Sequence, residues 1–430
     1  MMATRKSIAA VFSLSVLLVS IPAYALDWPE IFEPLGLHSI YIETSDEDWE
    51  TVRFDESTSI EVDALLGLND EEKILVRMRR KGGDGYPSEA DPQKVSLRID
   101  INDLVDGQKF HGLTKVNLEN GSGNGLVEEG LAWYLHQLAT GPDHTSTFAG
   151  LAAFVRVYVN GDYKGIYLNS EFRNKQFFRN RAICCDDIAT WLYKYDVIDE
   201  PELKTQDTDS AAYNTLCYAP FRGSNAIKGK NKKGGEGADC PTPSDNDLVA
   251  ELESLINMNS LLTVMAVNSH LSDVDSFADK GKNFYFADFE PKDGYQGEVP
   301  KRLYYAWDLD NGFAGGAVGS SIYGQESSRG KKSNLLQTQY QEVILNHPLY
   351  RARYNDIYSS LLDGPMSLAP VYAYLDGLAS LLPGPLSSEP YMPAIQDLAG
   401  RIEGLKTWLA DREASVRAQI AANGPPAPRN

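Results

Sequence analysis

Residues 154–171, FVRVYVNGDYKGIYLNSE, carry the clearest signal for β-structure in the chain. The run FVRVYV has the two-residue alternation of a strand, and YKGIYL provides a returning strand. Between them, Asn160 and Gly161 form the dipeptide that favours a two-residue type I′ turn. Glu171 follows the second strand directly. The segment therefore predicts an antiparallel hairpin that ends on a carboxylate.

Other strands are predicted on the N-terminal side of this hairpin. They lie at residues 37–63 (with HSIYIE and TVRF), 73–79 (KILVRMR), 94–101 (KVSLRIDI) and 115–120 (KVNLEN). The segment between the second and third, RRKGGDGYPSEADPQ, is rich in glycine and proline and predicts a loop. Residues 127–140 predict a helix, because Leu131, Leu135 and Leu138 mark one face.

The part of the chain after the hairpin is mainly helical by pattern. Residues 248–270 predict one long core helix, and FYFAD and RLYYAWD predict two antiparallel strands joined by a polar loop. From residue 334 onwards the pattern is helical, with breaks at Gly364-Pro365 and at residues 382–385. Strands that precede helices in this way indicate an α+β fold.

The first residues have the pattern of a secretory signal peptide. Arg5 and Lys6 precede an apolar run at residues 8–21, and Ala23-Tyr24-Ala25 matches a cleavage site. We expect a signal peptide at 1–25, cleavage after Ala25 and a secreted, periplasmic or cell-surface protein. The alternative is an uncleaved anchor, although the apolar run is short for a membrane span. No other segment is apolar and long enough to cross a bilayer, so no stable span is expected after cleavage.

The exported chain is predicted to form one domain at residues 26–422. Its parts are a strand-rich lobe at about 37–200, a polar insertion at about 203–246 and a helical lobe at about 247–422, before a disordered tail at 423–430. The insertion includes the basic run KGKNKK.

Four cysteines suggest two disulfide bonds in an oxidising compartment: Cys184, Cys185, Cys217 and Cys240. Adjacent cysteines rarely bond to each other, so Cys184 and Cys185 are each expected to pair with Cys217 or Cys240. A zinc site is the alternative, but the paired C-x-x-C spacing of such sites is missing.

The formal net charge of −20 describes an acidic protein. Such a surface repels phosphate backbones and anionic lipid, which argues against nucleic acid and against anionic membranes as partners.

The residues with the strongest chemical signal lie between positions 271 and 315. Asp273, Asp275 and Asn283 follow the predicted core helix, and Asp308 and Asp310 follow the second of the two later strands. Phosphoryl transfer needs a carboxylate that accepts or orients the hydroxyl proton, and an amide and a further carboxylate that hold Mg²⁺. In protein kinases these groups occur in the same order, although the spacing from Asp275 to Asn283 is three residues longer here.

Two simpler interpretations of these residues remain open. Asp, Asn and Gly are also common in turns, so both segments could be solvated loops. Asp308-Leu-Asp310-Asn-Gly312 is also similar to the start of a calcium-binding loop, but Gly319 occupies the position of its final glutamate.

Over roughly residues 40 to 420 the chain resembles the CotH family, the spore coat protein H-like kinases. The resemblance is carried by KVSLRI, KVNLENGSGNG, VRVYVNGDYKGIYLNSEF, WLYKYD, DSFADKGKNFYF, YYAWDLDNGFAG and NHPLYRARYNDIYSSLL. It implies an atypical protein-kinase-like fold with a strand-rich N-terminal lobe and a helical C-terminal lobe.

The resemblance also implies an activity and a set of roles. The activity is ATP-dependent phosphorylation of serine hydroxyls on protein substrates, with Mg²⁺, Mn²⁺ or Ca²⁺ as the metal. Asp275 would be the catalytic carboxylate. Asn283, Asp308 and Asp310 would be metal ligands. For ATP binding, Lys94 or Lys194 would face the phosphates, and Glu171 would orient a lysine or reach the metal.

Two departures from the family pattern support an alternative. The insertion ADKGKN lengthens the Asp-Ser…Asn segment, and the loop after residue 79 has Gly82, Gly83 and Gly85 but no Asn-Ser-Ser. The alternative is a pseudokinase, namely a non-catalytic spore-coat-like structural or surface adhesion protein. A calcium-stabilised binding module is the third possibility.

Overall fold

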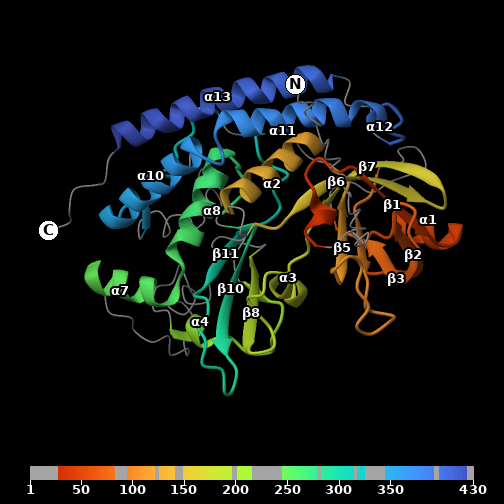
Figure 1. The fold of residues 1–430 in the computed structure, drawn as a ribbon, viewed down its shortest axis with the longest axis horizontal. Coiled ribbons are helices and arrows are strands. Elements are labelled where there is room, and N and C mark those ends of the chain that lie inside the picture. The colour runs from red at the N-terminus through yellow and green to blue at the C-terminus, as the bar shows by residue number, and fades with distance from the viewer. Residues whose placement is uncertain are drawn as a thin grey trace, which may run out of the picture.

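The computed structural model describes residues 28–82, 94–121, 125–140, 149–195, 201–215, 245–277, 282–313, 317–324, 344–391 and 397–423. Figure 1 shows an elongated molecule with a β-barrel at one end and helices at the other. A small second sheet lies between the two. The fold is therefore of the mixed α+β class, as predicted.

Seven strands form the barrel, in the order β1-β2-β3-β4-β5-β7-β6. The barrel closes where β1 pairs in parallel with β6, from His38↔Val155 to Ile42↔Val159. The alternating inward residues, such as Val76, Leu97 and Val157, are completely buried. The strands are β1 (His38–Glu43), β2 (Glu61–Leu68), β3 (Ile74–Arg80), β4 (Leu97–Asp100), β5 (Lys115–Glu119), β6 (Ala152–Val159) and β7 (Asp162–Ser170).

The predicted hairpin is confirmed as β6 and β7. Val159 pairs with Asp162 across a two-residue turn. In that turn Asn160 has φ 53° and Gly161 has φ 85°, the positive values that a type I′ turn requires.

The second sheet has the order β11-β10-β8-β9. The predicted pair FYFAD and RLYYAWD forms its antiparallel strands β10 (Phe284–Pro291) and β11 (Leu303–Ala306). The other two strands are β8 (Ile188–Tyr195) and β9 (Glu202–Leu203). A fully buried pair, Arg302 with Asp288 at 2.6 Å, joins β10 to the start of β11. Asn283 directly precedes β10, and Asp308 follows the end of β11 by two residues.

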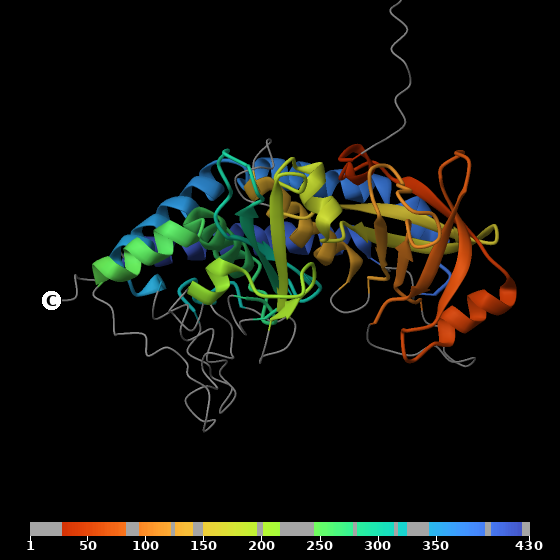
Figure 2. The same ribbon diagram turned by 90° about the horizontal axis from the view of Figure 1, so that it is seen from below.

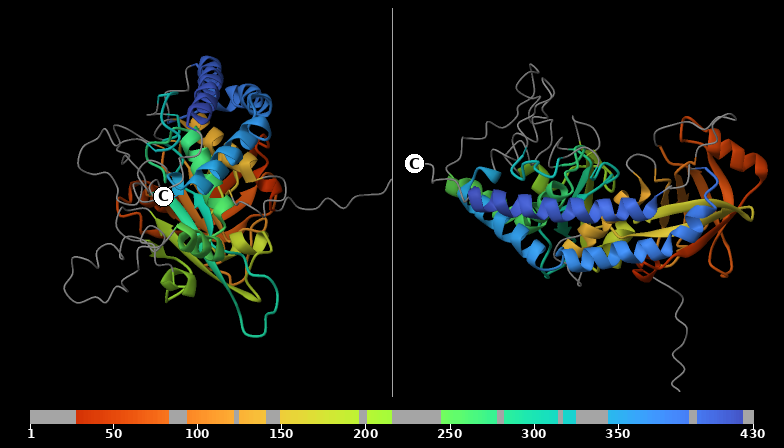
Figure 3. Two further views of the ribbon diagram at one scale, coloured as in Figure 1. Left: turned by 90° about the vertical axis from the view of Figure 1, so that its left-hand side faces the viewer. Right: turned by 90° about the horizontal axis from the view of Figure 1, so that it is seen from above.

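Long helices pack on one side of both sheets. Helix α13 (Leu398–Ala422) runs along the molecule from the helical end toward the barrel, and α11 (Leu368–Leu381) lies beside its barrel-side part (Figure 3). From below, in Figure 2, they lie behind the barrel and the second sheet. The longer helices are α2 (Leu126–Thr140), α7 (Asp245–Leu255), α8 (Met258–His270), α10 (Pro348–Asp363), α11 (Leu368–Leu381) and α13 (Leu398–Ala422). The shorter ones are η1 (Glu30–Phe32), α1 (Asp46–Phe54), α3 (Lys175–Asn180), α4 (Ala211–Thr215) and α12 (Pro383–Ser387).

Two predicted elements differ in the structure. The segment TVRF belongs to helix α1 and is not a strand, because Ser45 caps the helix by accepting from Asp48 N and three acidic residues follow in the first turn. The single long helix predicted at 248–270 is divided into α7 and α8. It divides because the side chain of Asn257 accepts from Ser260 N and starts α8, while Ile256 forms a bridge to Arg302.

The disulfide prediction was wrong for one pair of positions. Cys184 is bonded to Cys185 rather than to Cys217 or Cys240. The two cysteines are adjacent in the sequence, and their Cα atoms are 3.1 Å apart. Cys217 and Cys240 lie outside the described residues, as do the predicted signal peptide, most of the insertion and nearly all of the tail.

Within the described ranges, no helix combines the length and the apolar character needed to cross a membrane.

Candidate functional site

Asn283 connects the two acidic segments that the sequence singled out. Its side-chain amide donates to the backbone oxygen of Asp275 at 3.0 Å and to Asp275 Oδ2 at 3.1 Å. Its backbone oxygen accepts from the N–H of Trp307 at 3.1 Å, and Trp307 directly precedes Asp308. Asn283 has φ 58°, a left-handed conformation that asparagine tolerates better than most residues. One residue thus ties the loop after α8 to the end of β11.

Asp275 is held from a second side. Lys282 Nζ lies 2.7 Å from Asp275 Oδ2, and the backbone N–H of Asp275 donates to Asp273 Oδ1 at 2.9 Å. Lys282 comes from the insertion that lengthens this segment compared with ordinary kinases. The insertion therefore does not separate Asp275 from Asn283, and it adds a cation beside the carboxylate.

Asp273 is a buried carboxylate among other carboxylates. It is only 2% exposed, and Oδ2 has no hydrogen-bond partner among the described residues. Burial raises the pKa of Asp273 to about 7, although the N–H of Asp275 opposes this effect. The nearby charges that add to the rise are Asp275, Asp310 and Asp308.

Two further carboxylates in this region have raised pKa values. Burial and the neighbouring Asp308 raise the pKa of Asp310 to about 6. Burial and then Glu119 raise the pKa of Glu129, on α2, well above its usual range. Asp310 and Asp308 add to the effect on Glu129, and Lys81 opposes it. These mutual effects define an acidic cluster, made of Glu119, Glu129, Asp273, Asp275, Asp308 and Asp310.

Three cations surround the ring of Trp307, next to the acidic cluster. Lys81 Nζ lies 5.0 Å from the ring centroid, the Arg173 guanidinium carbon 5.2 Å and Lys194 Nζ 5.5 Å. Lys81, at the end of β3, also pairs with Glu119, which accepts from Ser170 Oγ at 3.0 Å. Arg173 is 3% exposed, and its Nε and Nη1 have no hydrogen-bond partner within the described part of the chain. Positive charge thus borders the negative cluster.

The two lysines proposed for ATP binding lie in different surroundings. Lys194, on β8, is one of the cations around Trp307. Lys94 is instead buried against Tyr167, with its Nζ 4.6 Å from the ring centroid, and it pairs with Glu389 at 3.5 Å.

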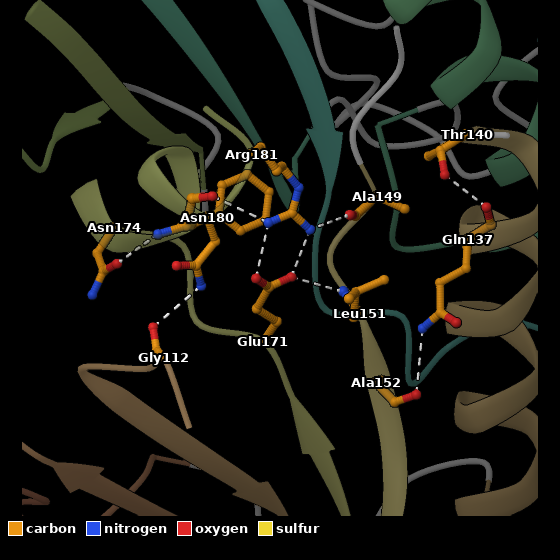
Figure 4. A network of polar contacts seen from close by, with 11 residues as sticks. Gly112, Gln137, Thr140, Ala149, Leu151, Ala152, Glu171, Asn174, Asn180 and Arg181 are labelled. Carbon is orange, nitrogen blue, oxygen red and sulfur yellow. Dashed lines mark hydrogen bonds and ion pairs between the residues drawn. The ribbon is translucent and has the colours of Figure 1, made fainter. Parts of the chain in front are cut away.

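Glu171 contacts an arginine rather than a lysine. Arg181 Nη1 donates to Oε1 at 2.9 Å and Arg181 Nη2 donates to Oε2 at 2.7 Å. Oε2 also accepts from the N–H of Leu151 at 3.0 Å (Figure 4). Both side chains are almost completely buried, at 1% and 0% exposure. In this structure Glu171 joins the end of β7 to the segment that starts β6 and to the residue after α3.

Arg412 forms hydrogen bonds to backbone oxygens next to both acidic segments. It is completely buried, although it comes from the long surface helix α13. Its guanidinium donates to four backbone oxygens, those of Ser269 (2.6 Å), His270 (3.3 Å), Val318 (2.8 Å) and Ser320 (2.6 Å). The first two are terminal carbonyls of α8, and that of Ser269 also accepts from the N–H of Ser272 at 3.1 Å. Arg412 therefore joins the helix that leads into Asp273 to the segment that follows Asp310.

No group of three or more His, Cys, Asp or Glu side chains in the described ranges is already arranged to hold a metal ion. The acidic cluster nevertheless brings six carboxylates together, and burial, followed by the neighbouring carboxylates, raises the pKa values of Asp273 and Asp310. A divalent cation that brings part of its own ligand shell fits such a site. Mg²⁺ usually does so, since it uses one or two carboxylates together with waters and phosphate oxygens.

Some residues near this site were found from the sequence, and others were missed. Asp273, Asp275, Asn283, Asp308 and Asp310 were singled out from their order along the chain, and Lys194 from its place in an apolar strand. The sequence did not assign Lys81, Glu119 or Glu129 to the site. Glu129 carried a usable signal, because it lies in a helix whose other residues are mostly apolar, where a charge needs a special reason.

The fold and the site define a mixed α+β protein in which carboxylates from two distant segments converge beside a group of cations. The family model described as CotH kinase protein matches residues 79–416, and the chain belongs to this family. The match includes the whole acidic cluster and all the cations named above. Among curated proteins, none matches the chain.

Proposed function

We propose that the protein is an exported kinase that transfers the γ-phosphoryl group of ATP to serine hydroxyls of secreted or surface proteins. In this proposal the fold is an atypical protein-kinase-like fold. The barrel serves as the N-terminal lobe, and the second sheet and helices serve as the C-terminal lobe. Family membership supports the reaction class. The observation that carries the proposal is Asn283, whose contacts hold Asp275 beside the segment of Asp308.

Asp308, Asp310 and Asn283 are the residues that would hold Mg²⁺, Mn²⁺ or Ca²⁺ together with the nucleotide. They fit such a role because carboxylate and amide oxygens suit these cations, and the carboxylates of Asp275, Asp308 and Asp310 lie close enough to raise the pKa of Asp273. When bound, the metal would neutralise charge on the β- and γ-phosphates.

The residues of the chain itself provide the remaining functions. Asp275 is the proposed acceptor of the serine hydroxyl proton, and Lys282 and Asn283 hold its carboxylate in one orientation. Lys81 and Lys194 are better placed than Lys94 to attract phosphates, because they lie around Trp307 beside the cluster. Glu119 restrains Lys81, which keeps that ammonium directed toward the cluster.

The second candidate is a pseudokinase that acts as a structural or adhesion protein. Two observations favour it. No metal-binding trio is preformed in the described ranges, and Lys94 and Glu171 are both engaged in buried ion pairs. The two candidates differ in whether phosphate is transferred.

The test uses the mature protein with labelled ATP, Mg²⁺ or Mn²⁺, and a serine-rich acceptor protein. Asp275→Ala and Asp308→Ala are expected to lower transfer by about 100-fold or more, as loss of a positioned catalytic group usually does. The control is Asp376→Ala on α11, an exposed carboxylate paired with Lys406. ATP with Mg²⁺ should also raise Tm more than either component alone. Absence of both label transfer and this Tm increase would support the pseudokinase.

A further inference from the structure

Strand β7 has a gap in its pairing at Ile166. Strand β5 pairs with β7 only from Asn117↔Ser170 to Glu119↔Leu168, and then β5 ends. In an antiparallel strand, the N–H and C=O of one residue point toward the same neighbouring strand. At Ile166, in the described part of the barrel, no strand residue occupies that side to bond these two groups.

An ion pair occupies the position of the missing strand. The N–H of Ile166 donates to Glu389 Oε2 at 2.9 Å, and Lys94 Nζ donates to the backbone oxygen of Ile166. Lys94 Nζ also lies 3.5 Å from Glu389 Oε1. The carboxylate and the ammonium therefore replace the acceptor and the donor that a neighbouring strand would offer.

Gly165 makes room for this arrangement. A Cβ atom at this position would lie 1.9 Å from Glu389 Oε1, and Gly165 has φ +106°, which side chains rarely allow. The side chains of Glu389 and Lys94 are 1% and 3% exposed. Burial lowers the pKa of Lys94 to about 8, and the carboxylate of Glu389 opposes this effect. The site is thus built closely around one carboxylate.

Glu389 belongs to the segment that crosses from the helices to the barrel. We call residues 383–389 the strap. The strap begins with α12, which follows α11 and lies beside β7 in Figure 1. Tyr163 on β7 donates from its hydroxyl to the backbone oxygen of Pro385 at 3.1 Å, which gives the strap a second attachment.

The strap matters for the site because the acidic cluster and its cations come from both ends of the molecule. Lys81 and Glu119 lie on barrel strands β3 and β5 or directly after them. Asp275 and Asp308 follow α8 and β11. The position of the barrel against the rest therefore sets how Lys81 lies relative to Asp308.

We propose that Glu389 and Lys94 are positioning residues that complete the barrel wall in place of a strand and so lock the barrel onto the C-terminal helices. This contact holds Lys81 and Glu119, which come from the barrel, at a fixed position relative to the segments of Asp275 and Asp308. Its effect on catalysis rests on the proposed kinase function, whereas its structural part does not.

The first experiment measures hydrogen exchange at the Ile166 amide together with Tm. Glu389→Ala removes the acceptor, so exchange at Ile166 should become at least about tenfold faster and Tm should fall by several degrees. Glu389→Gln keeps an acceptor oxygen, so the Ile166 amide should retain most of its protection from hydrogen exchange. Tyr163→Phe tests the second attachment in a variant that is expected to stay folded. Unchanged exchange at Ile166 in Glu389→Ala would overturn the proposal.

The charge-reversed double variant Lys94→Glu/Glu389→Lys separates strand replacement from simple charge attraction. A lysine at 389 cannot accept from the Ile166 N–H, and a glutamate at 94, when ionised, cannot donate to its carbonyl. If the ion pair replaces a strand, the double variant should therefore keep the faster exchange at Ile166 and the lower Tm, and should not return to wild-type values. Recovery of both to wild-type values would refute it. The matched control is the same reversal at the exposed pair Lys73 and Glu43, 2.7 Å apart, which should be tolerated.

The activity arm measures steady-state kinetics in the same variants. Glu389→Ala should raise the KM for ATP several-fold with a smaller change in kcat, because it displaces Lys81 but leaves Asp275 in place. A fall in kcat with an unchanged KM would refute the link to the site. If no variant or wild type transfers phosphate, the kinase function fails, and the exchange results still decide whether the strap replaces a strand.

Discussion

Asn283 combines an unusual backbone conformation with several hydrogen bonds in the site. It adopts φ 58°, its amide donates twice to Asp275, and its carbonyl accepts from Trp307. The backbone conformation and the side-chain contacts can be separated by mutation, because glycine accepts positive φ without strain while it lacks the amide.

Asn283→Gly is therefore expected to keep the fold while it releases Asp275. Phosphate transfer should fall by about 10- to 100-fold, since small misplacements of reacting groups have effects of this size. Tm should change by only a few degrees. Label transfer and thermal melts on the same preparation measure both quantities.

Asn283→Asp is the matched comparison. It tolerates the same φ but replaces a donor with a carboxylate that faces Asp275, so it should lower transfer further than glycine does. Equal transfer by wild type and both variants would show that Asn283 does not position Asp275.

At the scale of elements, the end of α8 depends on a residue from a distant helix. Arg412 of α13 satisfies carbonyls at the C-terminus of α8 and in the segment after Asp310. Its position 142 residues from His270 in the sequence means that no local pattern could predict this cap.

Arg412→Met is expected to lower the free energy of unfolding by about 2 kcal/mol or more, because the carbonyls of His270 and Val318 lose the guanidinium donor, whereas those of Ser269 and Ser320 keep Ser272 N–H and Gln419 Nε2. Arg412→Lys should recover part of this loss. Chemical denaturation measures the change.

Arg417→Met provides the control on the same helix. Arg417 is 40% exposed and pairs with Asp363 and Glu413, so its loss should have an effect below about 1 kcal/mol. Similar losses for Arg412→Met and Arg417→Met would contradict the role given to Arg412.

Elements with a strong local signal were predicted well. The hairpin of β6 and β7, helix α2 and strands β10 and β11 all formed where alternation, helical periodicity and turn residues indicated them. The prediction failed at TVRF, where the cap at Ser45 favoured a helix. It also failed at Asn257, where a new helix starts within a continuous apolar stretch. In both places a single hydrogen-bonding side chain had more influence than the apolar pattern.

At the scale of the whole molecule, the acidic cluster should make stability depend on pH. Asp273 and Asp310 have folded-state pKa values of about 7 and about 6, both raised. Their stabilising contribution is present below the unfolded pKa, near 4, and is lost as pH rises through 6 and 7. In the absence of metal and nucleotide, the protein should therefore become less stable from about pH 5 to pH 8.

Asp273→Asn isolates this effect. Asparagine can still accept from the N–H of Asp275, but it removes the buried charge. It is expected to stabilise the metal-free protein at pH 8 by about 1–3 kcal/mol, with little effect at pH 4. Thermal melts across this pH range compare Asp273→Asn with Asp376→Asn, which should show no such difference. Equal stability of Asp273→Asn and wild type at pH 8 would contradict the raised pKa.

The fold class, the main hairpin, the family and the order of the acidic residues could all be predicted from the sequence, because each of these depends on local patterns or short motifs. Which charged groups meet became clear only from the folded chain. Lys81, Glu119 and Glu129 join the site, while Lys94 pairs with Glu389, 295 residues away in the numbering. The physical reason is that ion pairs and shared burial depend on distances in space, and barrel closure and long-range helix packing set these distances.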